Sequence, residues 1–201
     1  MVTNNMKKFI CFSLFVLCFA LSSVITTQAQ EISPEAAEKI IAARAKKVIR
    51  AIKNKDMETL STFAHPTKGV RFAPYAYIET DAHLVFKSAK LKTLATDKKR
   101  YNWGSYDAAD GNIRLTFNRY YKRFIYDKDF ANAPSIGYNE ILSGGNTPFN
   151  ASEVYPQAIT VEYYFPNSPE EQMNWRSLRL LFEKKNGTWY LVAIVHSEWT
   201  I

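Results

Sequence analysis

The sequence predicts an α+β fold in which N-terminal helices pack on a curved antiparallel sheet. Residues 34–53 place apolar side chains at helical spacing, whereas the C-terminal part of the chain alternates apolar and polar side chains as strands do. Asn186 and Gly187 separate two of these predicted strands, and this dipeptide is typical of a tight hairpin turn. Helices followed by a run of strands are the element order of an α+β domain.

The first 29 residues have the features of a secretory signal peptide. Lys7 and Lys8 precede an apolar run from Phe9 to Val24, and residues 27–29 form a small-x-small cleavage site. The run is short for the roughly 20 apolar residues that span a bilayer, so cleavage is favoured over a membrane anchor. We therefore expect an exported, periplasmic or extracellular protein, whose single domain spans residues 30–201 and has no stable membrane anchor.

The composition of the expected mature chain argues against several classes of site. Both cysteines, Cys11 and Cys18, lie in the leader, which excludes disulfides and Cys-ligated zinc. Removing Lys7 and Lys8 from 26 basic residues leaves 24, against 19 acidic residues, for a net charge of +5. Because this excess is spread along the chain, we expect solvated helix faces and no nucleic acid partner.

Two helices are predicted at the start of the mature chain. Ser33 is a good N-cap, and Pro34 suits the first helical position. The first helix should end near Asn54, and Asp56 should cap a short second helix that Pro66 stops. The apolar stripe of the first helix consists of Ala37, Ile41, Ala45, Val48 and Ile52.

The segment HPTKGVRFAPYAYI, residues 65–78, joins these helices to a predicted strand. Gly69 lets the chain turn into the strand, whose alternation over 70–73 is cut by Pro74. The segment should therefore lie at the mouth between the helix and sheet layers. There it could line a pocket, or it could be a buried crossover with satisfied polar groups.

The remaining elements follow from shorter patterns. We expect a short helix over 88–96, a loop over 106–112, and a helix over 117–126 that Thr116 could cap and whose aromatic side chains belong to the core. Strands are expected over 136–142 and 158–165, followed by the hairpin around Asn186. The last strand is apolar on both faces, which predicts a central or doubly covered position.

This element order resembles the nuclear-transport-factor-2-like fold, in which helices cover a strongly bent sheet. The resemblance implies an enclosed space between helices and sheet, which is a ligand pocket in many members and an enzyme site in some. The segments HPTKGVRFAPYAYI, WGSY and WRSLRLLFEKKNGTWYLVAIVHSEWTI also resemble an uncharacterised family of small exported bacterial proteins, over most of the chain from His65 onward. This second resemblance implies export and a single domain, and it supplies no catalytic residue.

The three histidines are candidates both for metal ligands and for acid/base groups. No two of His65, His83 and His196 have the spacing that places two metal ligands on one element, so we predict no metal site. His65 and His196 could form a polar pair near a pocket, where an imidazole titrates near neutral pH. The alternative, which we favour, is that each of them caps a backbone group.

Neither a cofactor nor a nucleophile motif is present. The aspartates of 106–117 and 127–132 lack the spacing of a calcium loop, so we expect them to serve local turns. No glycine-rich phosphate loop or serine nucleophile motif occurs, and we predict no cofactor.

Arginines and aromatic rings are the remaining candidates for ligand recognition. Arg71, Arg176 or Arg179 could point inward as a clamp for a carboxylate or another anion. Glu162 could face a cavity as a base, but an outward position in a cross-strand pair with an arginine or lysine is favoured. Aromatic residues that could frame a site, or lie at the wet edge of the core, are Tyr75, Tyr77, Trp103, Tyr106, Trp175 and Trp199.

The sequence therefore favours a noncatalytic ligand-binding or envelope-interaction module with a pocket between helices and sheet. Its partner would be a small molecule, a glycan or an envelope protein, and a second copy of the chain could cover the last strand. The alternative is a pocket enzyme of the isomerase, dehydratase or hydrolase type, with His65 or His196 as acid or base. The candidate ligand-binding residues are His65, Arg71, Tyr75, Tyr77, Trp103, Arg179, His196 and Trp199.

Overall fold

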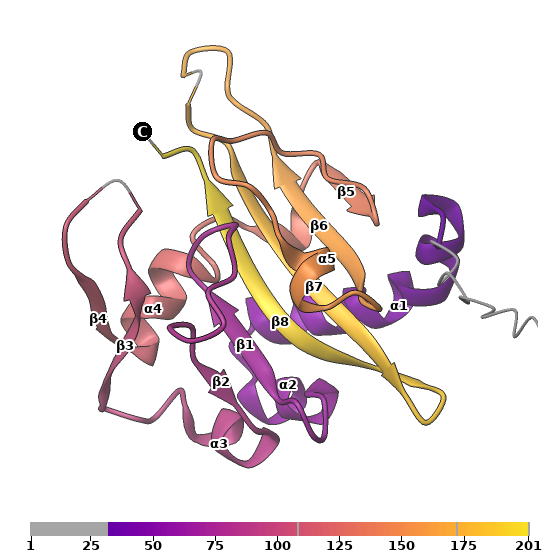
Figure 1. The fold of residues 1–201 in the computed structure, drawn as a ribbon, viewed down its shortest axis with the longest axis horizontal. Helices are drawn as coiled ribbons and strands as arrows, with labels where there is room; N and C mark the ends of the chain where they lie inside the picture. Colours follow the sequence, from indigo (N-terminus) through magenta and orange to yellow (C-terminus); the bar gives the residue numbers. More distant parts are fainter. Residues whose placement is uncertain (1–31, 108, 172, 201) are drawn as a thin grey trace, which may run out of the picture.

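The computed structural model describes residues 32–107, 109–171 and 173–200 (Figure 1). The predicted leader, residues 1–29, lies outside this part of the chain. Among the described residues, no helix is both long and apolar enough to cross a membrane. In chain order the elements are α1 (Pro34–Lys53), α2 (Met57–Phe63), β1 (Val70–Ala73), β2 (Val85–Phe86), α3 (Ser88–Thr93), β3 (Arg100–Ser105), β4 (Asn112–Thr116), α4 (Phe117–Phe124), the 3-10 turn η1 (Phe130–Asn132), β5 (Ser135–Tyr138), α5 (Ala151–Val154), β6 (Ile159–Phe165), β7 (Arg176–Lys185) and β8 (Thr188–Glu198).

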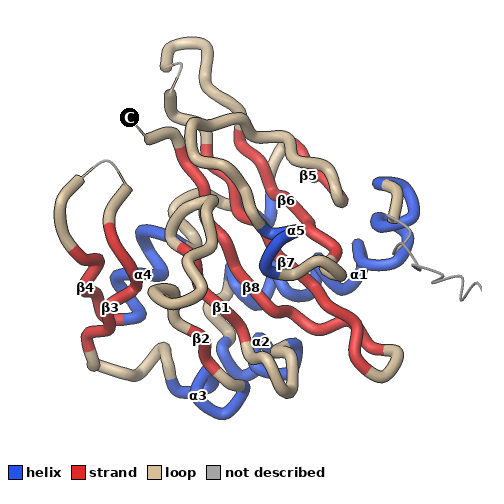
Figure 2. Tube along the Cα trace, in the orientation of Figure 1, coloured by secondary structure: helices blue, strands red, loops and turns tan. Residues whose placement is uncertain are grey.

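A curved six-stranded sheet lies at the centre of the molecule, with the strand order β2-β1-β8-β7-β6-β5 (Figure 2). The predicted α+β fold is confirmed, and β8 is a central strand as expected. One expectation is corrected, because β1 runs parallel to β8 while the other neighbours in this sheet are antiparallel. The reason is that Ala64 already lies beside Leu191 near the start of β8, so the chain enters the sheet from the same end.

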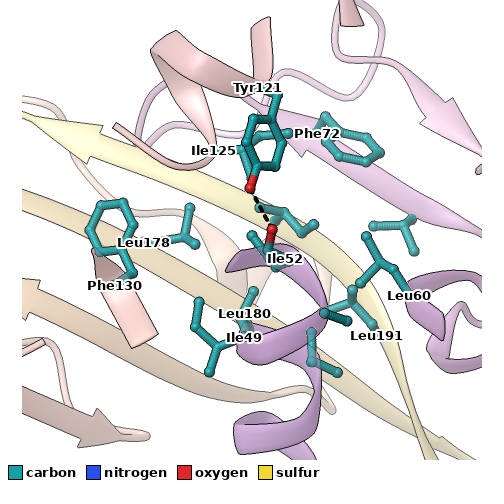
Figure 3. Close-up of a cluster of buried hydrophobic side chains, with 14 of the residues drawn as sticks. Ile49, Ile52, Leu60, Phe72, Tyr121, Ile125, Phe130, Leu178, Leu180 and Leu191 are labelled. Atoms are coloured by element: carbon teal, nitrogen blue, oxygen red, sulfur yellow. Dashed lines mark hydrogen bonds between the residues drawn. The ribbon is translucent and has the colours of Figure 1, made fainter. Parts of the chain in front are cut away.

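Helix α1 crosses one face of the sheet and buries the apolar stripe that its sequence predicts (Figure 1). The Ser33 side chain accepts a hydrogen bond from the Ala36 N–H at 3.3 Å, which caps the first turn. At the other end the Tyr121 hydroxyl donates to the Ile52 carbonyl, as the dashed line in Figure 3 shows. This bond fixes α4 against the last turn of α1.

Aromatic side chains fill the layer between the helices and the sheet. Trp103 stacks on Tyr120 with ring centroids 3.8 Å apart, and Phe72 makes edge contacts with both rings. The predicted core role of the α4 aromatics is confirmed. The fully buried aromatic residues of this layer are Phe72, Trp103, Phe117, Tyr120, Phe124, Phe130 and Phe182.

The opposite face of the sheet is covered by segments without long helices. Residues 74–82 and the stretch from 140 to 158, which includes α5, lie over β1, β8 and β7 (Figure 1). Ile78 and Tyr155 pack there against Leu181 and Val195. Strand β8 is thus buried on both faces by its own chain, which explains why residues 191–195 are all apolar.

Several elements differ from the sequence expectation. The strand predicted over 136–142 ends at Tyr138, because Asn139 adopts a φ of 48° and its side chain accepts the Thr160 N–H at 2.9 Å. The β3–β4 hairpin was not predicted. Its alternation is weak, and Trp103 becomes a core residue because Tyr120 of α4 and Phe72 of β1 pack against its ring.

Gly69 is a position where the backbone requires glycine. Its φ is +78°, and a Cβ atom there would lie 2.7 Å from the Phe86 carbonyl oxygen. We predict that Gly69→Ala lowers the free energy of unfolding by about 2–4 kcal/mol, through backbone strain and the clash with β2.

Urea unfolding of a matched pair measures this effect. Gly111 has a φ of +112°, but a Cβ atom there would meet no other atom within 4 Å, so Gly111→Ala should cost only the strain, about 1 kcal/mol. Equal losses in the two variants would contradict the close approach of β1 and β2.

Candidate functional site

Charged and polar side chains gather where β7 begins and β8 ends. We call them the His196 cluster, and they are Tyr75, Arg123, Asp127, Arg176, His196 and Glu198. His196 and Glu198 are two residues apart on β8 and so share a face, and Arg176 of β7 is the register partner of Glu198. This face is the one that carries the aromatic core, and Phe124 makes an edge contact with the His196 ring at 5.9 Å.

Two arginines hold the two carboxylates of the cluster. Glu198 accepts hydrogen bonds from Arg123 at 2.5 and 3.1 Å and lies 3.2 Å from Arg176. Asp127 accepts from Arg176 Nε at 3.1 Å. Each carboxylate is thereby partnered by at least one guanidinium group, an arrangement that stabilises buried charge.

His196 is fully buried, and both of its ring nitrogens face acceptors. Nδ1 lies 3.2 Å from the Pro74 carbonyl oxygen, and Nε2 lies 3.3 Å from Asp127 Oδ2. Burial raises the pKa of Asp127, but the hydrogen bond and charge of His196 and the charge of Arg176 outweigh it and place the pKa below its usual range.

Three side chains of the cluster could hold a metal ion by their donor types. Ligand atoms of Asp127, His196 and Glu198 lie within 4.8 Å of one another. However, both carboxylates already bind arginines, whose positive charge opposes a divalent cation. The geometry therefore favours a closed network of ion pairs over a metal centre.

A second buried ion pair lies on the opposite face of the sheet. Glu162 and Arg179 are cross-strand register partners with a contact of 3.1 Å, so the predicted cross-strand pair is present. The outward position expected for Glu162 is wrong, because Glu162 is 0% exposed. Residues 142 and 143 cover it and donate their backbone N–H groups to its carboxylate.

Arg179 is the arginine that does point inward as a carboxylate clamp. It holds Glu162 of its own chain, donates to Ser143 at 2.6 Å, and lies over the Phe149 ring at 4.3 Å. Burial lowers its pKa, and the charge of Glu162 opposes this change. The ion pair stabilises the segment around residues 142 and 143 that covers this face of the sheet. Because Arg179 is buried and holds Glu162, it is not open to the carboxylate of a ligand.

An open hollow of about 350 Å³ lies on this same side of the molecule, and we call it the Tyr77 hollow. Asn150 fixes one wall, since its side chain accepts the Ile78 N–H at 2.8 Å and donates to the Ile78 carbonyl at 3.2 Å. Arg71 fixes another, donating to the carbonyls of Thr80 and His83 at 2.8 and 2.9 Å. The hollow is lined by residues 77–82, Asn150 and Val154.

His83 closes the loop that forms this hollow. Its Nδ1 accepts the Glu79 N–H at 3.1 Å, which requires that nitrogen to be unprotonated. Burial, together with the charge of Arg71, lowers the pKa of His83 to about 4. At neutral pH the ring is therefore neutral, and its hydrogen bond with the Glu79 N–H is maintained.

The remaining predicted site residues lie apart from these groups. His65 is buried, and its Nδ1 accepts the Lys68 N–H at 3.0 Å, as expected of a residue that caps a backbone group. Trp103 is 0% exposed, and its indole N–H donates to the Leu115 carbonyl at 2.9 Å. Trp199 follows β8 and is half-buried.

The structure thus divides the predicted residues among several places. Tyr75 joins His196 in the cluster, and Arg71 supports the hollow that Tyr77 lines. Sequence reasoning missed Arg123, Asp127 and Glu198. The spacing of His196 and Glu198 on a predicted strand was the available signal, whereas the contact with Asp127 comes from the loop after α4 and has no local signature.

Comparison with protein-family models finds no match, and no curated protein matches the sequence. Two solved bacterial structures align with this chain, each with 11% identity over 83% of this chain and 89% of the other. One is described as a candidate calcium/calmodulin dependent protein kinase II association domain from Xanthomonas campestris, with a TM-score of 0.35. The other is described as an NTF2-like protein of unknown function from Pseudomonas putida KT2440, with a TM-score of 0.37. At this level of similarity, we transfer no property of either protein to this chain.

The neutral, buried His83 predicts a specific loss of stability in acid. The unfolded chain binds a proton at His83 below about pH 6.5, whereas the folded chain resists it until about pH 4. The contribution of His83 to the free energy of unfolding is therefore complete above about pH 6.5. As the pH falls from about 6.5 to about 4, up to about 3 kcal/mol of this free energy is lost.

Urea unfolding at about pH 7 and about pH 4.5 tests this prediction. His83→Asn keeps an acceptor near the Glu79 N–H but cannot titrate, so it should show a smaller loss on acidification than the natural protein. Equal losses would show that His83 does not contribute to the acid sensitivity.

Proposed function

We propose that this protein is an exported, noncatalytic ligand-binding module, and that the Tyr77 hollow receives the ligand. One observation carries the proposal: the hollow is open, yet its walls are fixed by hydrogen bonds that Arg71 and Asn150 make with the backbone. A preformed concave site with few polar groups is the usual form of a small-ligand site. This places the ligand outside the space between helices and sheet, which aromatic side chains occupy.

The chemistry of the lining favours a neutral, hydroxyl-rich ligand such as a glycan. Tyr77 presents a ring that is 44% exposed, on which the apolar face of a sugar can pack. Glu79 and Asp81 supply carboxylate acceptors for hydroxyl groups, and Thr80 supplies a hydroxyl that both donates and accepts. Val154 adds an apolar side chain to the lining.

The polar groups near the hollow support binding more than catalysis. Arg71 is engaged with backbone carbonyls and with the Tyr155 hydroxyl at 3.1 Å, and His83 is engaged with Glu79. A catalytic base needs a free lone pair within reach of the substrate. Neither of these groups offers one.

An enzyme that uses His196 is the second candidate, and the contact between His196 and Asp127 favours it. A histidine oriented by a carboxylate is a common acid/base pair. In this structure, however, the ring is fully buried and its second nitrogen faces the Pro74 carbonyl. Turnover would require the Asp127 or Pro74 contact to open.

Glycan binding is tested by thermal shift and calorimetry with neutral oligosaccharides, such as cellotriose and the N-acetylglucosamine trimer. We expect at least one to stabilise the protein, and Tyr77→Ala to weaken its binding about tenfold through the lost ring contact. Tyr106→Ala is the matched control, because Tyr106 is a similarly exposed tyrosine outside the hollow. An equal loss in both variants, or no binding by the natural protein, would refute the proposed site.

Export is supported by the charge and apolar pattern of residues 1–29, which lie outside the described residues. Expression of the whole chain in a Gram-negative host should yield a periplasmic or extracellular product whose first residue is Gln30. Intact-mass measurement of the fractionated protein checks this. A full-length product in the cytoplasm would contradict export.

A further inference from the structure

A second hollow, of about 480 Å³, lies between α1 and η1, on a different part of the surface from the Tyr77 hollow. We propose that it binds the phosphate group of a phosphate monoester. We call it the basic hollow, and its lining residues are Lys46, Ile49, Arg50, Lys53, Asn54, Ala131 and Asn132. The inference does not depend on the function proposed for the Tyr77 hollow.

Helical spacing brings the three cations of the basic hollow to one side of α1. Lys46, Arg50 and Lys53 are four and three residues apart, so they follow one another along a single face. Ile49 is buried beneath them, and Ala131 forms part of the opposite wall. The three side chains therefore border one concavity, whereas Lys39 and Lys47 of α1 lie outside its lining.

The positive charge around the basic hollow that remains after pairing matches the negative charge of a dianion. Lys53 binds Asp129 at 2.9 Å, so its charge is compensated. The hydroxyl of Tyr126 and the side chains of Lys53 and Asn132 lower the pKa of Asp129 to about 2, so Asp129 stays ionised from neutral pH well into the acid range. Among the described residues, Lys46 and Arg50 make no ion pair, and their two charges remain available.

A phosphate monoester suits these two charges. It carries nearly two negative charges at pH 7 and offers three acceptor oxygens. A guanidinium can bind two of them together, while an ammonium acts as a point charge. Because the hollow is of the size that holds small organic ligands, there is room for the group esterified to the phosphate.

Cations near a helix C-terminus also stabilise the helix itself, and this role needs no ligand. Arg50 and Lys53 lie in the last turn of α1, where they interact favourably with the free carbonyl groups. Lys46 lies one turn earlier, so the helix C-terminus does not account for it. Lys46 is therefore the residue that separates a ligand site from a stabilised helix end.

Titration calorimetry of the purified protein with glucose 6-phosphate tests the proposal, with glucose as the uncharged comparison. The double variant Lys46→Glu, Arg50→Glu should weaken phosphate ester binding at least tenfold. The double variant Lys39→Glu, Lys47→Glu changes the net charge equally, at exposed α1 positions outside the hollow, and should change the affinity less than twofold. Thermal unfolding of both variants verifies that each is folded.

Two sources of a phosphate monoester are separated by a second arm of the experiment. Flotation with phosphatidylcholine vesicles, with and without phosphatidic acid, tests a lipid headgroup in place of a soluble ester. Binding to either source that is lost in the Lys46, Arg50 variant and retained in the Lys39, Lys47 variant supports the site. Equal losses in the two variants, or no binding to either source, would overturn it.

Discussion

The burial of β8 on both faces is the constraint on which the rest of the structure depends. One face packs against α1 and the aromatic layer, and the other packs against the segments 74–82 and 140–158. The same chain supplies the layer on each face of β8. The loops over 74–82 and 140–158 therefore pack on one face of the sheet as the helices pack on the other. This is why the walls of the Tyr77 hollow can be fixed without a long helix.

Each face of the sheet compensates its buried charges in a different way. The His196 cluster lies at the end of the sheet, where two arginines and His196 contact two carboxylates. The pair of Glu162 and Arg179 lies under a covering loop and is completed by serine and backbone groups. Removing one partner of such a pair leaves an uncompensated buried charge, so these networks tie the loops to the strands.

The two hollows lie outside these networks and differ in charge. The Tyr77 hollow combines an aromatic ring with carboxylates, on which the proposal of a neutral hydroxyl-rich ligand rests. In the basic hollow, Lys46 and Arg50 make no ion pair with any described residue, and the proposal of a phosphate rests on these two charges. A glycan and a phosphate ester are both compatible with an envelope location, which the predicted leader also favours. The core between helices and sheet is packed with aromatic side chains and serves stability.

The sequence by itself determined the local structure: the cap at Ser33, the buried stripe of α1, the turn at Asn186 and Gly187, and the central position of β8. These follow from hydrogen bonding, periodicity and backbone conformation within a few residues. Only the tertiary structure decided that β1 is parallel to β8, that Glu162 is buried, and that Asp127 meets His196. Those outcomes join segments that lie far apart in the sequence, and no local preference encodes which distant segment covers a given face.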